Sequence, residues 1–165
     1  MINLIVACGN NRVIGKNGRL PWTIPEDWDY FMNTTSGGSM IMGKTCYDEF
    51  APHSHDREVI ALTRDHTFRF PHAKTAHSLT HALSLAENEQ IWICGGEALY
   101  QEAFPLASRL YLTLIEHDFE GDVFFPSWEK TFSKILTQRK VQTEEFTLEF
   151  LVLEKMNKDW LAPKA

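Results

Sequence analysis

Three acidic residues lie among aromatic side chains in one short stretch of the chain, LPWTIPEDWDYF. The acids are Glu26, Asp27 and Asp29. Pro25 favours a helix that starts near Ile24, because a proline is tolerated in the first turn of a helix, where its missing N–H costs little. A helix turns by about 100° per residue, so the three carboxylates point in different directions.

The helical phase separates Asp27 from the other two acids. Ile24, Trp28 and Phe31 fall on one apolar face, and Asp27 lies at its edge. A carboxylate directed at an apolar surface is uncommon unless it has a partner or a function, so Asp27 is a candidate site residue. This stretch is equally compatible with an acid in the first turn that only complements the helix dipole.

Glycines, basic residues and hydroxyl groups recur where predicted strands end. These turns are Gly43-Lys44-Thr45 after residues 39–42, Thr63-Arg64 at the end of 58–63, and Gly95-Gly96 between 90–94 and 97–103. Backbone N–H groups at the start of a helix attract phosphate, and ligands bind at the carboxyl edge of a parallel sheet. The pattern indicates a phosphorylated cofactor, most plausibly a dinucleotide.

Apolar strands alternate with short helices along the chain. We expect strands at 2–8, 39–42, 58–63, 72–78, 90–94, 109–115, 132–138 and 146–155, and helices at 24–33, 43–50, 78–87 and 97–103. This order predicts a single α/β domain over 1–165, with a central, mostly parallel twisted sheet of about eight strands, an antiparallel C-terminal strand and helices on both faces.

Two segments fall outside these elements. The connection Gly9–Thr23 is long for a compact domain, which favours a functional lid, and Asn17-Gly18 supplies flexibility at its tip. Residues 157–165 are expected to form a loosely ordered tail, in which Trp160 and Leu161 could dock.

Composition narrows the class of protein. The 165 residues are 44% apolar and carry a formal charge of −6, so no electrostatic footprint for nucleic acid or an anionic membrane is expected. Three cysteines without metal-ligand spacing argue against a disulfide framework and a metal site. No signal peptide or membrane span is recognised. We expect a cytoplasmic protein.

Several segments together resemble the dihydrofolate reductase family. They are Val13-Ile14-Gly15, Leu20-Pro21-Trp22, Pro25-Glu26-Asp27, Phe31, Ile41-Met42-Gly43-Lys44, Arg57, Cys94-Gly95-Gly96 with Tyr100, Leu112-Thr113, and Gly121-Asp122 with Phe125-Pro126. They occur in the family's order and spacing from Met1 to about Lys155. An aspartate at position 27 resembles the bacterial enzymes.

The resemblance implies reduction of 7,8-dihydrofolate to 5,6,7,8-tetrahydrofolate with NADPH, by hydride transfer to pterin C6 and protonation at N5. Asp27 would bind the amidine-like edge of the pterin, the Thr113 hydroxyl would bond that carboxylate and the pterin, and Trp22 would order a nearby water. A water relay to N5 is expected rather than direct proton donation. Arg57 would pair in bidentate fashion with the substrate's α-carboxylate. Antifolate inhibitors would bind the same site, and the protein would be a monomer.

The family resemblance also implies two sets of binding residues. The substrate set is Ile5, Ala7, Asp27, Trp28, Phe31, Arg57, Cys94 and Thr113. The cofactor set is Ala7, Ile14, Gly15, Gly18, Leu20, Gly43, Lys44, Thr45, Cys46, Leu62, Thr63, Arg64, His77, Cys94, Gly95, Gly96, Glu97, Ala98, Leu99 and Tyr100. Within it, Lys44, Thr63 and Arg64 would surround the 2′-phosphate, and Gly95-Gly96 with the helix that follows would carry the pyrophosphate.

Three departures from the family pattern affect these expectations. Cys46 stands where the family usually has threonine, so a hydroxyl contact to the cofactor is lost or passes to Thr45. The segment 51–56 replaces a proline-rich segment before Arg57, which weakens an apolar contact to the benzoyl ring. Cys94 stands where a branched aliphatic residue often lines the pterin pocket, and we expect it to act as a small apolar filler.

Two rival functions are weighed against this interpretation. A pyrimidine reductase of riboflavin synthesis shares the fold type and the cofactor edge, but it needs neither a carboxylate from the first helix nor Arg57. A catalytically silent module that binds dinucleotides or antifolates would not need Trp22, Asp27 and Thr113 together.

Overall fold

The apolar run at the N-terminus forms the centre of the sheet. The computed structural model describes residues 1–17 and 19–156, and in it this run is strand β1 (Ile2–Gly9). It pairs in parallel with β6 (Ile91–Ile93) on one side and β7 (Arg109–Ile115) on the other. A strand covered on both faces needs apolar residues at nearly every position, and six of the eight residues of β1 are buried.

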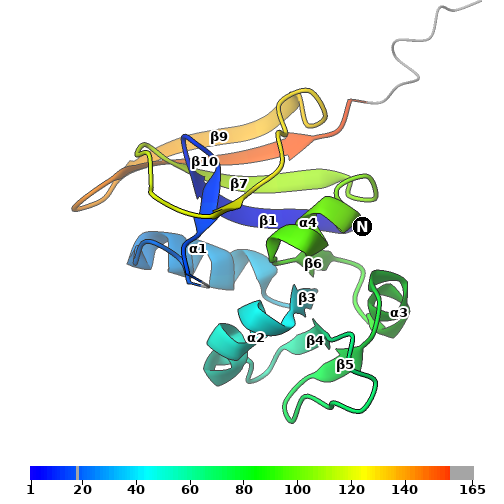
Figure 1. The fold of residues 1–165 in the computed structure, drawn as a ribbon. Helices are drawn as coiled ribbons and strands as arrows, with labels where there is room; N and C mark the ends of the chain where they lie inside the picture. The colour runs from blue at the N-terminus through cyan, green and yellow to red at the C-terminus, as the bar shows by residue number, and fades with distance from the viewer. Residues whose placement is uncertain (18, 157–165) are drawn as a thin grey trace, which may run out of the picture.

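Eight strands of the described chain form one sheet, in the order β5-β4-β3-β6-β1-β7-β10-β9 (Figure 1). The other strands are β3 (Ser39–Gly43), β4 (Glu58–Leu62), β5 (Lys74–Ala76), β9 (Lys134–Gln142) and β10 (Thr147–Glu154). β10 runs antiparallel to both β7 and β9, and the pairings among the first six strands of the order are parallel. The predicted α/β class is confirmed.

Helices cover both faces of the sheet, because strand residues alternate in direction. In β3, Ile41 packs in the cluster that includes side chains of α3 and α4, whereas Met40 and Met42 pack in the cluster that includes α2. Along the described chain the helices are α1 (Pro25–Thr35), α2 (Lys44–Phe50), α3 (Leu79–Leu85) and α4 (Glu97–Ala103), with a 3₁₀ turn, η1, at Ala51–His53. Ser78 caps α3 by accepting a hydrogen bond from the backbone N–H of His81 (3.0 Å), as its sequence position predicts.

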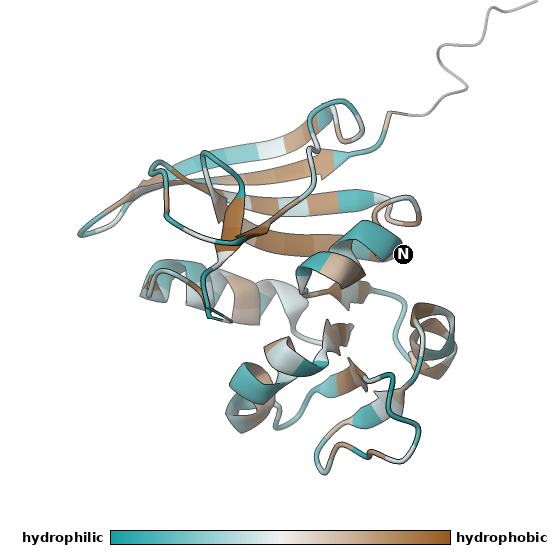
Figure 2. Ribbon diagram, viewed as in Figure 1, coloured by the Kyte–Doolittle hydropathy of each residue, from teal (hydrophilic) through white to brown (hydrophobic). Residues whose placement is uncertain are grey.

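The edge strand β9 differs from the sequence expectation, which placed it at 132–138. It begins at Lys134 and continues to Gln142, because its polar second half pairs with β10 at the edge of the sheet. Figure 2 shows β1 in brown and most of β9 in teal, in agreement with their burial. The described residues include no helix long and apolar enough to cross a membrane.

The long connection expected to be a lid contains a strand of its own. β2 (Val13–Gly15) pairs antiparallel with β8 (Val123–Phe124), more than a hundred residues later. Gly121 allows this close approach, since a Cβ there would lie 2.3 Å from Val13 Cγ1. Gly18 of the connection, and the tail 157–165 with Trp160 and Leu161, lie outside the described residues.

The central strands should dominate stability. Leu110 of β7 is fully buried, so Leu110→Ala should lower the free energy of unfolding by about 2–5 kcal/mol through lost burial and a cavity. Ile135 of β9 is 56% exposed, and Ile135→Ala is the matched control, with an expected loss below about 1 kcal/mol. Denaturant titration at neutral pH measures both. Equal losses would contradict this placement of the core.

Candidate active site

A cavity of about 1250 Å³ crosses the carboxyl ends of the central parallel strands. Ala7 of β1, Gly43 of β3, Leu62 of β4 and Cys94 after β6 all line it. Parallel α/β sheets place ligands at this edge. The volume exceeds that of an ordinary pocket for one small molecule, about 300–1,000 Å³, so it can hold two ligands side by side.

Most of the sequence-predicted residues meet in this cavity. Those that line it are Ile5, Ala7, Ile14, Gly15, Leu20, Trp22, Asp27, Trp28, Phe31, Gly43, Lys44, Thr45, Cys46, Leu62, Thr63, Arg64, His77, Cys94, Gly95, Gly96, Glu97, Ala98, Leu99, Tyr100 and Thr113. Arg57 is the exception among the described residues, and Gly18 is not described.

Asp27 reaches the cavity from the first turn of α1. Its backbone N–H donates to Ile24 O (3.1 Å), which fixes the start of the helix before Pro25. The pKa of the Asp27 carboxyl is raised to about 6. Burial, the larger effect, raises the pKa, and a hydrogen bond from the Thr113 side chain partly offsets it. The carboxyl is therefore mostly ionised at neutral pH and takes up a proton in mild acid.

Thr113 is held opposite α1 by the sheet. It lies on β7, in register with Ala7 of β1 and Phe150 of β10, and it is only 2% exposed. A β-branched residue suits a strand, and its buried hydroxyl needs a partner, which Asp27 provides. The sheet and α1 thus bring together a hydrogen-bonded carboxyl and hydroxyl inside a largely apolar wall.

Aromatic side chains line the cavity together with this acid. Ile24 and Trp22 are buried, and the Trp22 ring lies 4.8 Å from that of Phe119. Trp28 instead lies at the rim, 39% exposed, with its ring 4.8 Å from that of His53. Ile24, Trp28 and Phe31, the apolar face expected from helical phase, all line the cavity, and the rings of Trp28 and Phe31 lie 5.8 Å apart.

Arg57 is anchored just outside the cavity. Its Nη1 donates to Thr35 Oγ1 (2.8 Å), and its Nη2 donates to Met32 O (2.6 Å). The Thr35 hydroxyl in turn donates to Phe31 O (2.8 Å). In the described chain Nε–H has no acceptor, so the guanidinium keeps donor capacity for a carboxylate beside Phe31.

The opposite half of the cavity presents glycine backbone and basic side chains. The Gly43 N–H donates to Gly95 O (2.8 Å), which joins the turns after β3 and β6, and a Cβ on Gly96 would meet nothing within 4 Å. Lys44 Nζ lies 3.6 Å from Asp48 and 5.5 Å from the Phe68 ring centroid. The exposed Arg64 forms no ion pair within the described residues. This half is suited to an anionic ligand.

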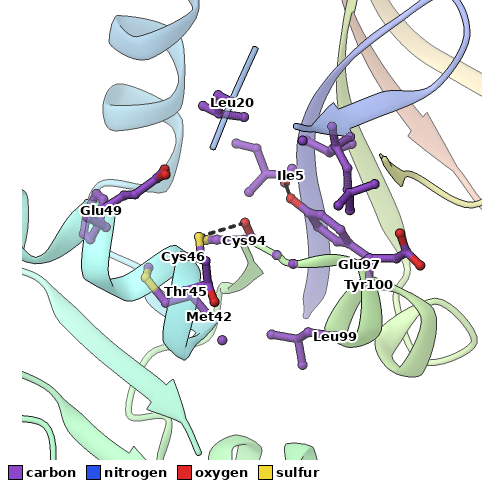
Figure 3. Close-up of a pocket in the computed structure, with 18 of the residues that line it drawn as sticks. Ile5, Leu20, Met42, Thr45, Cys46, Glu49, Cys94, Glu97, Leu99 and Tyr100 are labelled. Atoms are coloured by element: carbon purple, nitrogen blue, oxygen red, sulfur yellow. Dashed lines mark hydrogen bonds between the residues drawn. The ribbon is translucent and has the colours of Figure 1, made fainter. Parts of the chain in front are cut away.

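Two cysteines and a tyrosine form the floor between the halves (Figure 3). Cys46 Sγ donates to Cys94 O (3.5 Å), and the Tyr100 hydroxyl donates to Ile5 O (2.7 Å). Burial raises the pKa of the Cys46 thiol to about 12 and the pKa of the Cys94 thiol well above its usual value. Both thiols are therefore neutral and unreactive at neutral pH.

Several cavity or supporting residues were not predicted from the sequence. Tyr30, Glu49 and Phe50 line the cavity, and Thr35 holds Arg57. Thr35 gave a signal that could have been used, since it is a polar residue one turn after Phe31 on the same helix. Tyr30 lies on α1 itself, whereas Glu49 and Phe50 come from α2, where Phe50 packs against Trp28 and Phe31 of α1.

The chain matches known proteins along nearly its whole length. The family model described as dihydrofolate reductase matches residues 1–155. A dihydrofolate reductase of Staphylococcus haemolyticus is 44% identical over 126 residues, which cover 76% of each chain. One of Bacillus subtilis is 36% identical over 161 residues, covering 95% of this chain and 96% of that protein.

A solved structure has the same fold. It is described as dihydrofolate reductase from Enterococcus faecalis complexed with NADP(H) and RAB-propyl. The two chains superpose with a TM-score of 0.85 at 24% identity, over 95% of this chain and 97% of the other. With the sequence matches to relatives above 30% identity, this agreement leads to one conclusion: the chain belongs to the dihydrofolate reductase family.

Proposed function

We propose that this protein is an NADPH-dependent reductase that converts 7,8-dihydrofolate to tetrahydrofolate. The observation that carries the proposal is the Asp27 carboxyl, hydrogen-bonded by Thr113 and held in an apolar half of a cavity whose other half is basic. The nicotinamide cofactor, when bound, supplies the hydride for the reduction.

Asp27 is suited to a substrate with paired N–H donors and a basic nitrogen. An ionised carboxylate accepts two hydrogen bonds from an amidine-like edge such as that of a pterin. A fixed negative charge also stabilises the positive charge that develops when N5 is protonated. The raised pKa lets Asp27 hold a proton for part of the time near neutral pH, which a water could pass to N5.

The residues of the basic half fit NADPH. Gly96 leaves open space for a phosphate to approach the backbone, and Lys44 and Arg64 add the positive charge that a 2′-phosphate needs. Thr63 and His77 line the same part of the cavity, where His77 Nδ1 lies 3.1 Å from Thr63 O. Trp22 and the β2 residues Ile14 and Gly15 help to exclude water.

Arg57 and Thr35 support a substrate that carries a carboxylate outside the cavity. The two hydrogen bonds that the Arg57 guanidinium donates to Thr35 and Met32 fix its plane, which reduces the entropy lost when a carboxylate binds. We assign the α-carboxylate of the substrate's glutamate to this guanidinium. The substrate would then lie between Asp27 and Arg57, packed against Phe31 and Phe50.

The direct test of this function is an absorbance assay with NADPH and dihydrofolate. We expect NADPH oxidation that depends on dihydrofolate and is much slower with NADH, because NADH lacks the 2′-phosphate. A ribosylaminopyrimidine substrate serves as the comparison. Turnover of that compound without turnover of dihydrofolate would replace the proposal with a pyrimidine reductase, and binding of NADPH without any turnover would indicate a silent binding module.

The Asp27→Asn substitution should separate activity from stability. Activity should fall strongly at pH 7 and recover in part below pH about 6, where solution protons replace the help of the carboxylate. Stability should change in the opposite direction. The pKa of Asp27 is raised from 3.8 to about 6 in the folded protein, so the protein loses stability as the pH rises from about 4 to 6 and the carboxyl ionises. Above pH about 6 the loss reaches about 2–3 kcal/mol.

Thermal denaturation and pH–rate profiles measure both effects. Asp27→Asn should raise the melting temperature at pH 7 and leave it nearly unchanged at pH about 4, where the wild-type carboxyl is already mostly neutral. A lower melting temperature at pH 7, or an activity loss that is the same at every pH, would contradict the assigned role of Asp27.

Thr35 variants should test the Arg57 contact. Thr35→Val removes the acceptor of Arg57 Nη1, so KM for dihydrofolate should rise about tenfold with little change in kcat. Thr35→Ser keeps the hydroxyl and should restore the wild-type value. The control substrate is dihydropteroate, which lacks the glutamate, and its KM should not change. An equal rise in KM for both substrates would show that Thr35 stabilises the fold and does not position Arg57 for the carboxylate.

A further inference from the structure

One hydrogen bond joins two walls of the cavity that are remote in sequence. The backbone N–H of Phe124 donates to Glu97 Oε2 over 3.1 Å. Glu97 is the first residue of α4, and Phe124 is the last residue of β8. We propose that Glu97 is a positioning residue that fastens the flap to the half of the cavity that binds the cofactor. The flap is defined as β2 and β8 with the adjoining residues Arg12, Asp122 and Phe125.

The flap is a unit held together by its own backbone. Besides the β2–β8 pairing, the Asp122 N–H donates to Gly15 O (3.1 Å) and the Phe125 N–H donates to Arg12 O (2.8 Å). Arg12 Nη1 also donates to Phe125 O (3.1 Å). Whatever positions β8 therefore positions β2 as well, including the residues of β2 that line the cavity.

Two contacts attach this unit to α4. Phe125 is fully buried, with its ring 5.1 Å from that of Tyr100 and 6.4 Å from that of Phe104, so its apolar side chain sets where the flap lies. The bond from Phe124 to Glu97 is polar and directional, and it fixes the strand beside Val123, a residue that lines the cavity. A short strand has few ladder bonds of its own, so one added bond is a large fraction of its support.

The same bond controls the direction of a negative charge. Glu97 follows Gly95-Gly96, where the proposed function places the phosphates of NADPH, and a free carboxylate there would repel them. Figure 3 shows the Glu97 carboxylate on the far side of the Tyr100 ring from Cys46 and Cys94. With the Phe124 N–H as partner, the carboxylate is held away from the cavity floor and supports the flap.

Two substitutions at Glu97 separate the hydrogen bond from the charge. Glu97→Gln keeps an acceptor oxygen for the Phe124 N–H, whereas Glu97→Ala removes it. Glu97→Ala should weaken NADPH binding and speed its dissociation by about three- to tenfold, because one hydrogen bond is lost. The KM for dihydrofolate should change little. Glu97→Gln should stay within about twofold of wild type. Glu145→Gln, an exposed acid in the β9–β10 turn, controls for net charge.

Hydrogen exchange of the Phe124 amide tests the bond without any cofactor. It should be protected in the wild type and in Glu97→Gln, and it should exchange faster in Glu97→Ala while amides of β1 and β7 do not change. The exchange result does not depend on the proposed function. If the protein bound no NADPH, the proposed function would be overturned, and hydrogen exchange would still decide the role of Glu97. Equal protection in all three proteins, or equally tighter NADPH binding in both variants, would overturn the inference.

Discussion

The balance between burial and hydrogen bonding at one carboxyl group is the constraint on which the site depends. Burial disfavours the charged form of Asp27, and the Thr113 hydroxyl favours it, so the pKa of the group comes to about 6. A deeper site would keep the carboxyl neutral and unable to bind a cationic edge. A wetter site would keep it fully charged, with no proton to share near neutral pH. The fold maintains this balance by holding Asp27 on α1 and Thr113 on β7 within hydrogen-bonding reach of each other.

The parallel sheet brings the residues of both halves of the cavity to this point. Strands β1, β3, β4 and β6 end at one edge, so glycine turns and basic residues that are far apart in sequence lie together on one side of the cavity. α1 enters the other side of the same edge and supplies Asp27 and the aromatic wall. A cavity of about 1250 Å³ thus has a basic half and an apolar, acidic half, which is the arrangement that a two-substrate reduction requires.

Much of this arrangement could be predicted from the sequence, because the strong signals are local. Buried strands appear as apolar runs, and glycine pairs mark the turns that approach a ligand. The flap could not be predicted, since β2 and β8 are two to three residues long and pair across more than a hundred residues. Trp28 lines the cavity as expected, but its exposure at the rim could not be predicted, because helical phase gives a direction and not what packs there. The anchoring of Arg57 by Thr35 depends on how α1 lies against β4, which only tertiary structure determines.

The Asp27 carboxyl of the folded protein is expected to titrate near pH 6. Carbon-13 NMR of protein labelled at aspartate carboxyl groups measures this directly, with Asp27→Asn used to assign the resonance. We expect a midpoint near pH 6 in the wild type, and a higher midpoint in Thr113→Val, where the hydroxyl that favours the charged form is gone. A midpoint near the ordinary value of 3.8, or one that Thr113→Val leaves unchanged, would contradict this expectation.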